Sequence, residues 1–358
     1  MRIAIPASLL VLTTFLPSQQ VEPSSPPWQR ARAVWFGNGE TPSIAAEVGF
    51  GFEALPFDDD QKRAFDGLKV GGHLALGKTM WSTFETFTDV ECGKEKVKSG
   101  QYYAAVTKSA DGFALALFDA AKVRSGQLLP GTSTGTTAIA TLPLRAADGT
   151  GSALAAEWEL QDGGASLHLH VGPHTLTAEL RVNGSAGAFP LAQPEPRRCS
   201  RIAFGAAKGD AQPFAALDHG APPWNAEHAA AASALPVGKR WRLGQDWPTT
   251  LETNVPLTLA GKKLAAGSWH LTLAKQKGEA WSLVVSEARA DYAAKVDGFA
   301  PDAVHPVLEV PLKPGKAAVA SPTLAVEFTA ASKGTELAIT FGEQRLTVPI
   351  AAAVKARG

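Results

Sequence analysis

An internal repeat constrains this chain more than any other feature. When the sequence is shifted by 167 positions, residues 71–100 align with residues 238–267 without a gap, and about 8 of the 30 positions are identical. The identities include a T-x-E-T segment centred on Glu85 in the first stretch and on Glu252 in the second. Self-similarity at a fixed spacing indicates two copies of one structural unit.

Apolar periodicity shows what that unit is. In the second copy, Leu257 and Leu259 flank Thr258, while Leu271 and Leu273 flank Thr272. Alternation with a period of two is typical of strands with one buried face, and the Gly-containing turns between such runs favour antiparallel hairpins. We therefore expect an all-β fold made of two tandem antiparallel β-sandwich domains. Helices should be few and short, with one over residues 225–235 that uses Asn225 as its N-cap.

The N-terminus resembles an export signal. Arg2 precedes a mostly apolar run, Ile3–Leu16, which is too short to span a bilayer but fits the apolar part of a signal peptide. A buried strand or helix of the fold is the alternative. We expect cleavage near Ser18 and an extracytoplasmic protein, either periplasmic or secreted. The predicted order is a signal peptide (1–18), a flexible segment (19–34), a first β-sandwich repeat (35–182), a linker (183–201), a second β-sandwich repeat (202–351) and a tail (352–358).

Charge narrows the choice of partners. The chain has 34 basic and 34 acidic side chains, whereas nucleic-acid binding needs a basic surface. The N-terminal run is too short to span a bilayer, and no other apolar stretch approaches that length. The partner is then an unknown small molecule, a glycan or an envelope protein. The basic cluster of Arg197, Arg198 and Arg201 is interpreted as part of a solvated linker, with docking to an acidic partner as the alternative.

The second copy resembles a known family. Its segments 237–244 (VGKRWRLG), 249–253 (TTLET) and 260–269 (AGKKLAAGSW) are similar to motifs of the bacterial exported family catalogued as domain of unknown function 2911. The resemblance covers roughly residues 202–350. It implies an exported β-rich domain, but it brings no catalytic residues. The first copy departs from the motif, because Leu74 and Ala75 stand where the second copy has Trp241 and Arg242. The resemblance therefore implies a tandem pair whose first member has diverged.

The T-x-E-T strands suggest carboxylate chemistry. Glu85 and Glu252 have the outward phase of equivalent strands, and glycoside hydrolysis uses two carboxylates in one cleft. Because each copy offers only one, we interpret both as residues of a solvated strand face or as carboxylates bonded to neighbouring threonines. No catalytic residue is assigned.

Histidines and cysteines were considered as ligands or crosslinks. His168 and His170 share one strand face, and His174 follows a Gly-Pro turn, so that zinc or copper binding is conceivable. Exposed strand histidines are the favoured interpretation, and no metal or cofactor is predicted. Cys92 has an inward phase and is expected to behave as a small apolar residue. A disulfide between Cys92 and Cys199 is left open.

Tryptophans provide the binding hypothesis. Trp241 and Trp247 flank a Gly-containing loop next to Arg242, and exposed tryptophans beside charged groups suit a stacking ligand. The predicted ligand-binding set is Trp241, Arg242, Trp247 and Glu252; the alternative is a tryptophan that closes the end of a sandwich. No P-loop, nucleophile elbow or dinucleotide motif is present. We expect a non-enzymatic binding or structural envelope protein, with an extracytoplasmic hydrolase or a carbohydrate-binding protein as alternatives.

Overall fold

The computed structural model describes residues 19–21, 28–37, 44–130, 137–185, 189–205, 211–294, 296, 300–332 and 334–353. The predicted signal peptide and residues 354–358 of the predicted tail lie outside these ranges. The described residues form antiparallel sheets with four short α-helices, so the all-β prediction is confirmed. None of these helices is long and apolar enough to cross a membrane.

The first half of the molecule runs from β2 to β13. Its elements are β2 (Trp28–Phe36), β3 (Ile44–Glu53), α1 (Asp59–Asp66), β4 (His73–Ala75), β5 (Ser82–Thr86), β6 (Val90–Cys92), β7 (Glu95–Val97), β8 (Gly100–Ser109), β9 (Gly112–Asp119), α2 (Ala120–Ser125), β10 (Ala140–Asp148), β11 (Leu154–Gln161), β12 (Gly164–Val171) and β13 (His174–Val182). Because β10 pairs with both β9 and β13, these strands form one continuous sheet. The sheet curls until β11 packs on β2, and it encloses one apolar core.

The second half runs from β15 to β25. Its elements are β15 (Arg198–Phe204), β16 (Phe214–His219), α3 (Ala226–Ala234), β17 (Arg240–Arg242), β18 (Thr250–Thr253), β19 (Leu257–Leu259), β20 (Lys262–Leu264), β21 (Gly267–Lys275), η1 (Lys277–Glu279), β22 (Trp281–Glu287), α4 (Ala288–Ala293), η2 (Pro301–Ala303), β23 (Pro306–Pro311), β24 (Lys313–Ala331) and β25 (Gly334–Ala352). The larger sheet, from β15 to β23, faces the smaller sheet β20-β19-β25-β24 across a second core.

Strand order and register agree between the halves. The first half contains the order β3-β5-β8-β9-β10 and the second half β16-β18-β21-β22-β23, and α1 and α3 follow β3 and β16. Glu85 pairs with Gly49 and Gln101, while Glu252 pairs with Ala216 and Ser268. Each of these residues has its counterpart 167 positions further along the chain. The predicted correspondence of the two T-x-E-T strands is therefore present in the sheets themselves.

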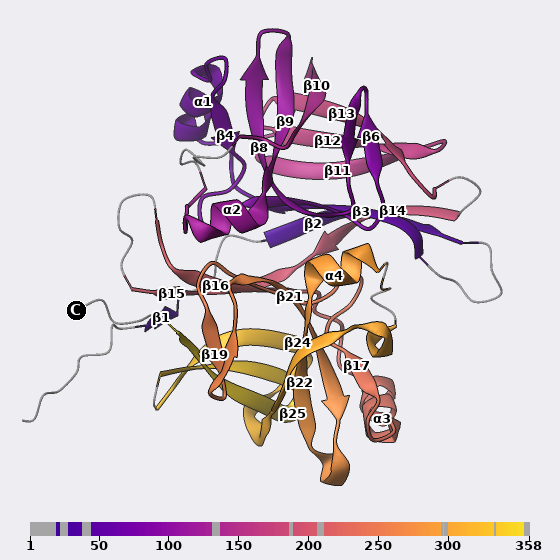
Figure 1. Ribbon diagram of the computed structural model, residues 1–358, viewed down its shortest axis with the longest axis vertical. Helices are drawn as coiled ribbons and strands as arrows, with labels where there is room; N and C mark the ends of the chain where they lie inside the picture. The colour runs from indigo at the N-terminus through magenta and orange to yellow at the C-terminus, as the bar shows by residue number, and fades with distance from the viewer. Residues whose placement is uncertain are drawn as a thin grey trace, which may run out of the picture.

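The two halves are stacked, with β2 and β3 of the first facing β15, β16 and β21 of the second (Figure 1). Each half also receives an edge strand from the segment that precedes the other. β14 (Phe189–Pro196), which leads into β15, pairs with β2, and β1 (Gln19–Val21), which precedes β2, pairs with β15. The contact is thus built from reciprocal elements, which gives the pair an approximate two-fold relationship.

Strands occupy parts of both segments that the sequence predicted as flexible or linking. β1 and most of β2 lie within residues 19–34, and β14 and the start of β15 lie within residues 183–201. Arg197 and Arg201 are almost fully buried, so their interpretation as solvated linker residues is wrong. The proline-rich composition of residues 183–201 favoured a linker, but prolines are also tolerated in edge strands such as β14.

Candidate functional site

A cavity of about 310 Å³ opens in the second half, between α3 and the larger sheet. This volume lies at the lower end of the range for small-molecule sites. Its walls are mainly aromatic and aliphatic, and its lining comprises Pro222, Pro223, Trp224, His228, Ala232, Trp241, Arg242, Leu243, Gly244, Gln245, Leu273, Trp281, Leu324 and Phe341. These residues come from α3, β17, β21, β22, β24 and β25 and from the loops beside them.

Local sequence explains how the walls are placed. Asn225 caps α3 by accepting a hydrogen bond from the backbone of His228 at 2.9 Å, which starts the helix just after Trp224. Trp224 is fixed by its backbone, whose N–H donates to the carbonyl of Pro322 at 2.7 Å. Its ring packs against Phe341 with a centroid distance of 4.7 Å. On the opposite side, Trp241 is held on β17 by pairing with Leu273 of β21.

One helix position decides whether this space is open. Phe65 is the buried residue of α1, and Ala232, 167 positions later, is the buried residue of α3. In the first half, the Phe65 ring fills the site by stacking between Phe113 and His174, with centroid distances of 5.1 and 4.6 Å. Alanine lacks that ring, so the corresponding volume in the second half stays empty. The two halves therefore share a strand order but differ in whether this space beside the helix is filled.

Three polar residues belong to the cavity lining: His228, Arg242 and Gln245. His228 stacks on Trp224, and its Nδ1 atom is buried without a hydrogen-bond partner among the described residues. Arg242 donates a hydrogen bond to the backbone carbonyl of Asp246. No aspartate or glutamate belongs to the lining that the described residues provide. Among the described lining residues, Arg242 is the only arginine, lysine, aspartate or glutamate.

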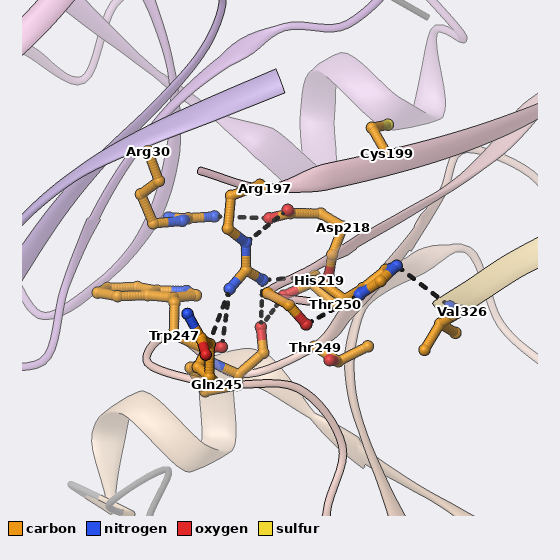
Figure 2. Close-up of polar contacts among 12 residues, drawn as sticks. Arg30, Arg197, Cys199, Asp218, His219, Gln245, Trp247, Thr249, Thr250 and Val326 are labelled. Carbon is orange, nitrogen blue, oxygen red and sulfur yellow. Dashed lines mark hydrogen bonds and ion pairs between the residues drawn. The ribbon is translucent and has the colours of Figure 1, made fainter. Parts of the chain in front are cut away.

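The loop of residues 243–249 contributes to one wall of the cavity. Arg197 holds this loop by hydrogen bonds to its backbone carbonyls (Figure 2). This buried guanidinium donates to the carbonyl of Trp247 at 3.0 Å and to that of Pro248 at 3.0 Å. It also donates to the carboxylate of Asp218 at 2.7 Å. Although burial alone would raise the pKa of Asp218, Arg197 and Arg30 together hold that pKa below its usual range.

Arg30 connects this loop to the first half. It donates to Glu85 at 2.9 Å and to Asp218 at 3.1 Å, and its guanidinium lies 4.5 Å from the ring centre of Trp247. Glu85 also accepts a hydrogen bond from the hydroxyl of Tyr292 on α4 at 2.8 Å. Burial by itself would raise the pKa of Glu85, but these partners and Gln101 bring it below the ordinary value. Glu85 is thus a buried, ionised and fully engaged carboxylate.

The carboxyl of Glu252 differs from that of Glu85 in its protonation. Burial, and then the negative charge of Glu85, raise its pKa to about 8. The guanidinium of Arg124 on α2 lies 3.9 Å from its carboxyl, beyond hydrogen-bonding distance. Glu252 therefore holds a proton at neutral pH.

The four predicted binding residues fall into two pairs. Trp241 and Arg242 line the cavity, whereas Trp247 and Glu252 are buried where the two halves meet. The interpretation of Glu85 and Glu252 as solvent-facing is wrong, because each outward strand face is covered by the other half. The two carboxyls, one from each half, lie close enough for the negative charge of Glu85 to raise the pKa of Glu252.

The histidine cluster of the first half forms separate pairs. His168 lies 3.1 Å from Glu159 and His170 lies 3.2 Å from Glu157 across the strands, while His174 stacks on Phe65. In the described part of the chain, no group of three or more histidine, cysteine or acidic side chains is arranged to hold a metal ion. Sequence reasoning overlooked the pairing carboxylates because they lie on β11, the neighbouring strand.

Neither Cys92 nor Cys199 is part of a disulfide. Cys92 lies in the core of the first half, where burial, followed by Glu179 and Glu95, raises its pKa to about 11. Cys199 lies at the contact between the halves, with its sulfur 3.2 Å from that of Met80. The disulfide that the sequence left open is not formed.

Two important residues, Ala232 and His228, were not singled out from the sequence, and a third, Arg197, was assigned to a solvated linker. A comparison of the helices at the same spacing of 167 residues would have placed Ala232 opposite Phe65. His228 carried no local signal, and the basic cluster around Arg197 did not reveal its partners, because both roles depend on contacts made by the folded chain.

Comparison with known proteins identifies one family. Residues 220–350 match a protein family of unknown function, DUF2911. The matched region contains the whole cavity lining and lies within the second half. Neither curated proteins nor solved structures provide a match.

Proposed function

We propose that this chain is an exported, non-enzymatic binding protein whose second half holds a small, largely apolar ligand in the cavity beside α3. The observation that carries the proposal is the replacement of the Phe65 plug by Ala232. An unfilled cavity in a core costs stability, so a second half selected for stability alone would be expected to keep the space filled. The space is instead lined by three tryptophans, whose flat faces suit a stacked ligand.

Differences at equivalent positions occur together around the cavity. Besides Phe65 and Ala232, Leu74 corresponds to Trp241, Ala75 to Arg242 and Gln61 to His228. Ala232 opens space, Trp241 adds an aromatic wall, Arg242 adds a cation, and His228 replaces an amide with an imidazole. Such a combination supports a binding site that belongs to the second half.

The first half acts in this proposal as a fixed support. Arg30 covers Trp247, and Asp218 joins Arg30 to Arg197, which holds the carbonyls of the 243–249 loop. Buried charged hydrogen bonds restrict the positions available to such a loop. We further propose that the first half is a diverged copy of the matched family domain, which the common strand order and the constant residue spacing support.

The alternative sites receive less support. A glycan stacked on both Trp241 and Trp247 would need an exposed Trp247, but that side chain is 0% exposed and lies beneath Arg30. A hydrolase that used Glu85 would have to break its bonds to Arg30, Gln101 and Tyr292. The cavity requires no such rearrangement.

Export is the second part of the proposal. Cleavage near Ser18 would start the mature chain close to Gln19, the first residue of β1, which pairs with β15. Expression of the full chain in a Gram-negative host, followed by N-terminal sequencing of the periplasmic and culture fractions, tests this. A mature start within a few residues of Gln19 is expected; an intact N-terminus found only in the cytoplasm would contradict export.

The binding proposal is tested with a neutral fluorescent probe, N-phenyl-1-naphthylamine. The chain should bind it with saturable enhancement of its fluorescence, and Ala232→Phe should abolish saturable binding, because the new ring occupies the space that Phe65 occupies in the first half. Ala234→Phe at the exposed end of α3 is the matched control and should bind as the unaltered chain does. Equal binding by the unaltered chain and Ala232→Phe would contradict the proposal.

A further inference from the structure

The helices α1 and α3 begin in the same way but differ at the third residue after the cap. In α1, Asp58 accepts a hydrogen bond from the backbone N–H of Gln61 at 2.9 Å. In α3, Asn225 accepts one from the backbone N–H of His228, also at 2.9 Å. The two caps lie 167 positions apart, and so do the two third residues. The caps therefore hold the two side chains at equivalent places, where the second half has an imidazole and the first an amide.

The imidazole of His228 has an unsatisfied hydrogen-bonding atom. The residue belongs to the cavity lining, and its ring stacks on Trp224 with a centroid distance of 6.1 Å. Its Nδ1 atom is buried and has no hydrogen-bond partner among the described residues. A buried polar atom in this state is costly unless a ligand or an ordered water satisfies it. The imidazole thus offers one hydrogen-bonding position to a molecule that occupies the cavity.

The polar side chains of the wall indicate which group would fill that position. A histidine ring nitrogen accepts or donates a hydrogen bond according to its tautomer, and the amide of Gln245, another lining residue, offers both roles. Arg242 already donates to the backbone carbonyl of Asp246. A hydroxyl group is both a donor and an acceptor. It can therefore pair with the imidazole in either tautomer.

Most of the cavity wall is apolar. Trp224 and Phe341 form one part of it, with ring centroids 4.7 Å apart, and Trp241, Trp281 and Leu273 contribute other parts. Flat aromatic walls favour a planar partner, through stacked or edge-to-face contacts. Burial of apolar surface supplies most of the favourable free energy in such a site, so the body of the ligand must be largely apolar.

We propose that the ligand is a planar aromatic compound that carries a hydroxyl group, and that His228 recognises this hydroxyl through Nδ1. This inference rests on the proposed binding function, which it deepens by naming the ligand class and a residue that determines specificity. In the first half, Phe65 stacks in the corresponding space and Gln61 stands at the position of His228. The recognition therefore belongs to the second half.

Two probes of similar size test the ligand class, because 2-naphthol carries a hydroxyl where 2-methylnaphthalene carries a methyl group. Their affinities are measured by displacement of N-phenyl-1-naphthylamine from the unaltered chain and from His228→Leu. The ratio of the two affinities should shift against 2-naphthol by about tenfold in His228→Leu, as expected for the loss of a buried hydrogen bond. Comparing ratios cancels the difference between the probes in their transfer from water. His305→Leu, at an exposed histidine outside the lining, is the matched control and should leave the ratio unchanged.

A second measurement uses the unaltered chain and decides alone if His228→Leu does not fold. In nitrogen NMR of the chain with isotopically labelled histidine, the Nδ1 resonance of His228 should shift much more with 2-naphthol than with 2-methylnaphthalene. An affinity ratio that His228→Leu does not change, or equal shifts with both probes, would overturn the hydroxyl inference and leave the cavity function standing. Failure of N-phenyl-1-naphthylamine to bind, or binding that Ala232→Phe does not alter, would overturn both.

Discussion

Glu85 and Glu252 occupy the same position on equivalent strands, yet one is ionised and the other is protonated at neutral pH. Glu85 has Arg30, Gln101 and Tyr292 as hydrogen-bond partners, whereas among the described residues Glu252 has a more distant Arg124 and experiences the repulsion of Glu85. Two carboxylates near one another in a buried site cannot both ionise at low cost. The approximate two-fold relationship between the halves therefore does not extend to the protonation of these two carboxyls.

This asymmetry predicts how pH affects stability. Because the pKa of Glu252 is raised from 4.5 to about 8, the folded chain binds more protons than the unfolded chain between those values. The contribution of Glu252 is fully present below about pH 4.5 and is lost as pH rises to about 8. Glu252→Gln, which mimics the protonated acid, should become more stable than the unaltered chain by about 2–4 kcal/mol as pH rises from 5 to 8. Urea unfolding at several pH values measures this difference.

Glu85→Gln is the matched comparison for that experiment. It replaces an ionised group that Arg30 needs, so it should destabilise the chain by about 3–5 kcal/mol at pH 7, as found for broken buried ion pairs. Similar pH profiles for both variants would show that the two carboxyls have equivalent states, contrary to their surroundings here.

Arg197 should matter far more than its neighbour Arg198. Its guanidinium is buried and bonded to Asp218, Trp247 and Pro248, whereas Arg198 is exposed. Arg197→Met should lower the free energy of unfolding by about 3–5 kcal/mol, because carbonyls and a carboxylate lose their donor. It should also speed amide hydrogen exchange in the 243–249 loop. Arg198→Met should change stability by less than about 0.5 kcal/mol. Equal effects of the two substitutions would place the Arg197 contacts in doubt.

The plug residue gives a prediction about the first half. Phe65→Ala removes a ring stacked between Phe113 and His174, and it should cost about 3–5 kcal/mol of stability through lost burial and the cavity left behind. Ala232→Phe should cost much less, because the second half already has the space. Chemical denaturation compares the two. A larger loss in Ala232→Phe would mean that the two helix positions are not equivalent.

Much of the fold could be predicted from period-two alternation. Leu257 and Leu259 on β19, and Leu271 and Leu273 on β21, are buried as their phase indicated, and the Asn225 cap begins α3. Local patterns of this kind report which face of a strand meets its own core. They do not report whether the opposite face meets water or another half of the molecule.

The incorrect sequence predictions arise because local patterns do not show what covers the outer face of a strand. Glu85 and Glu252 do point away from their own cores, but the stacked arrangement buries both. Trp247 lies beside a Gly-containing loop, a pattern that favours exposure, and it is covered by Arg30 from a distant strand. Only half of the predicted binding set, Trp241 and Arg242, lines the cavity, because the cavity was created by a residue that no motif marks, Ala232.

The most direct test of the account is a crystal structure of the chain grown with N-phenyl-1-naphthylamine. The account predicts probe density between Trp224 and Trp241 and no probe density beside Phe65 in the first half. A probe seated at the contact between the halves, or an empty cavity in a chain that binds the probe in solution, would contradict it.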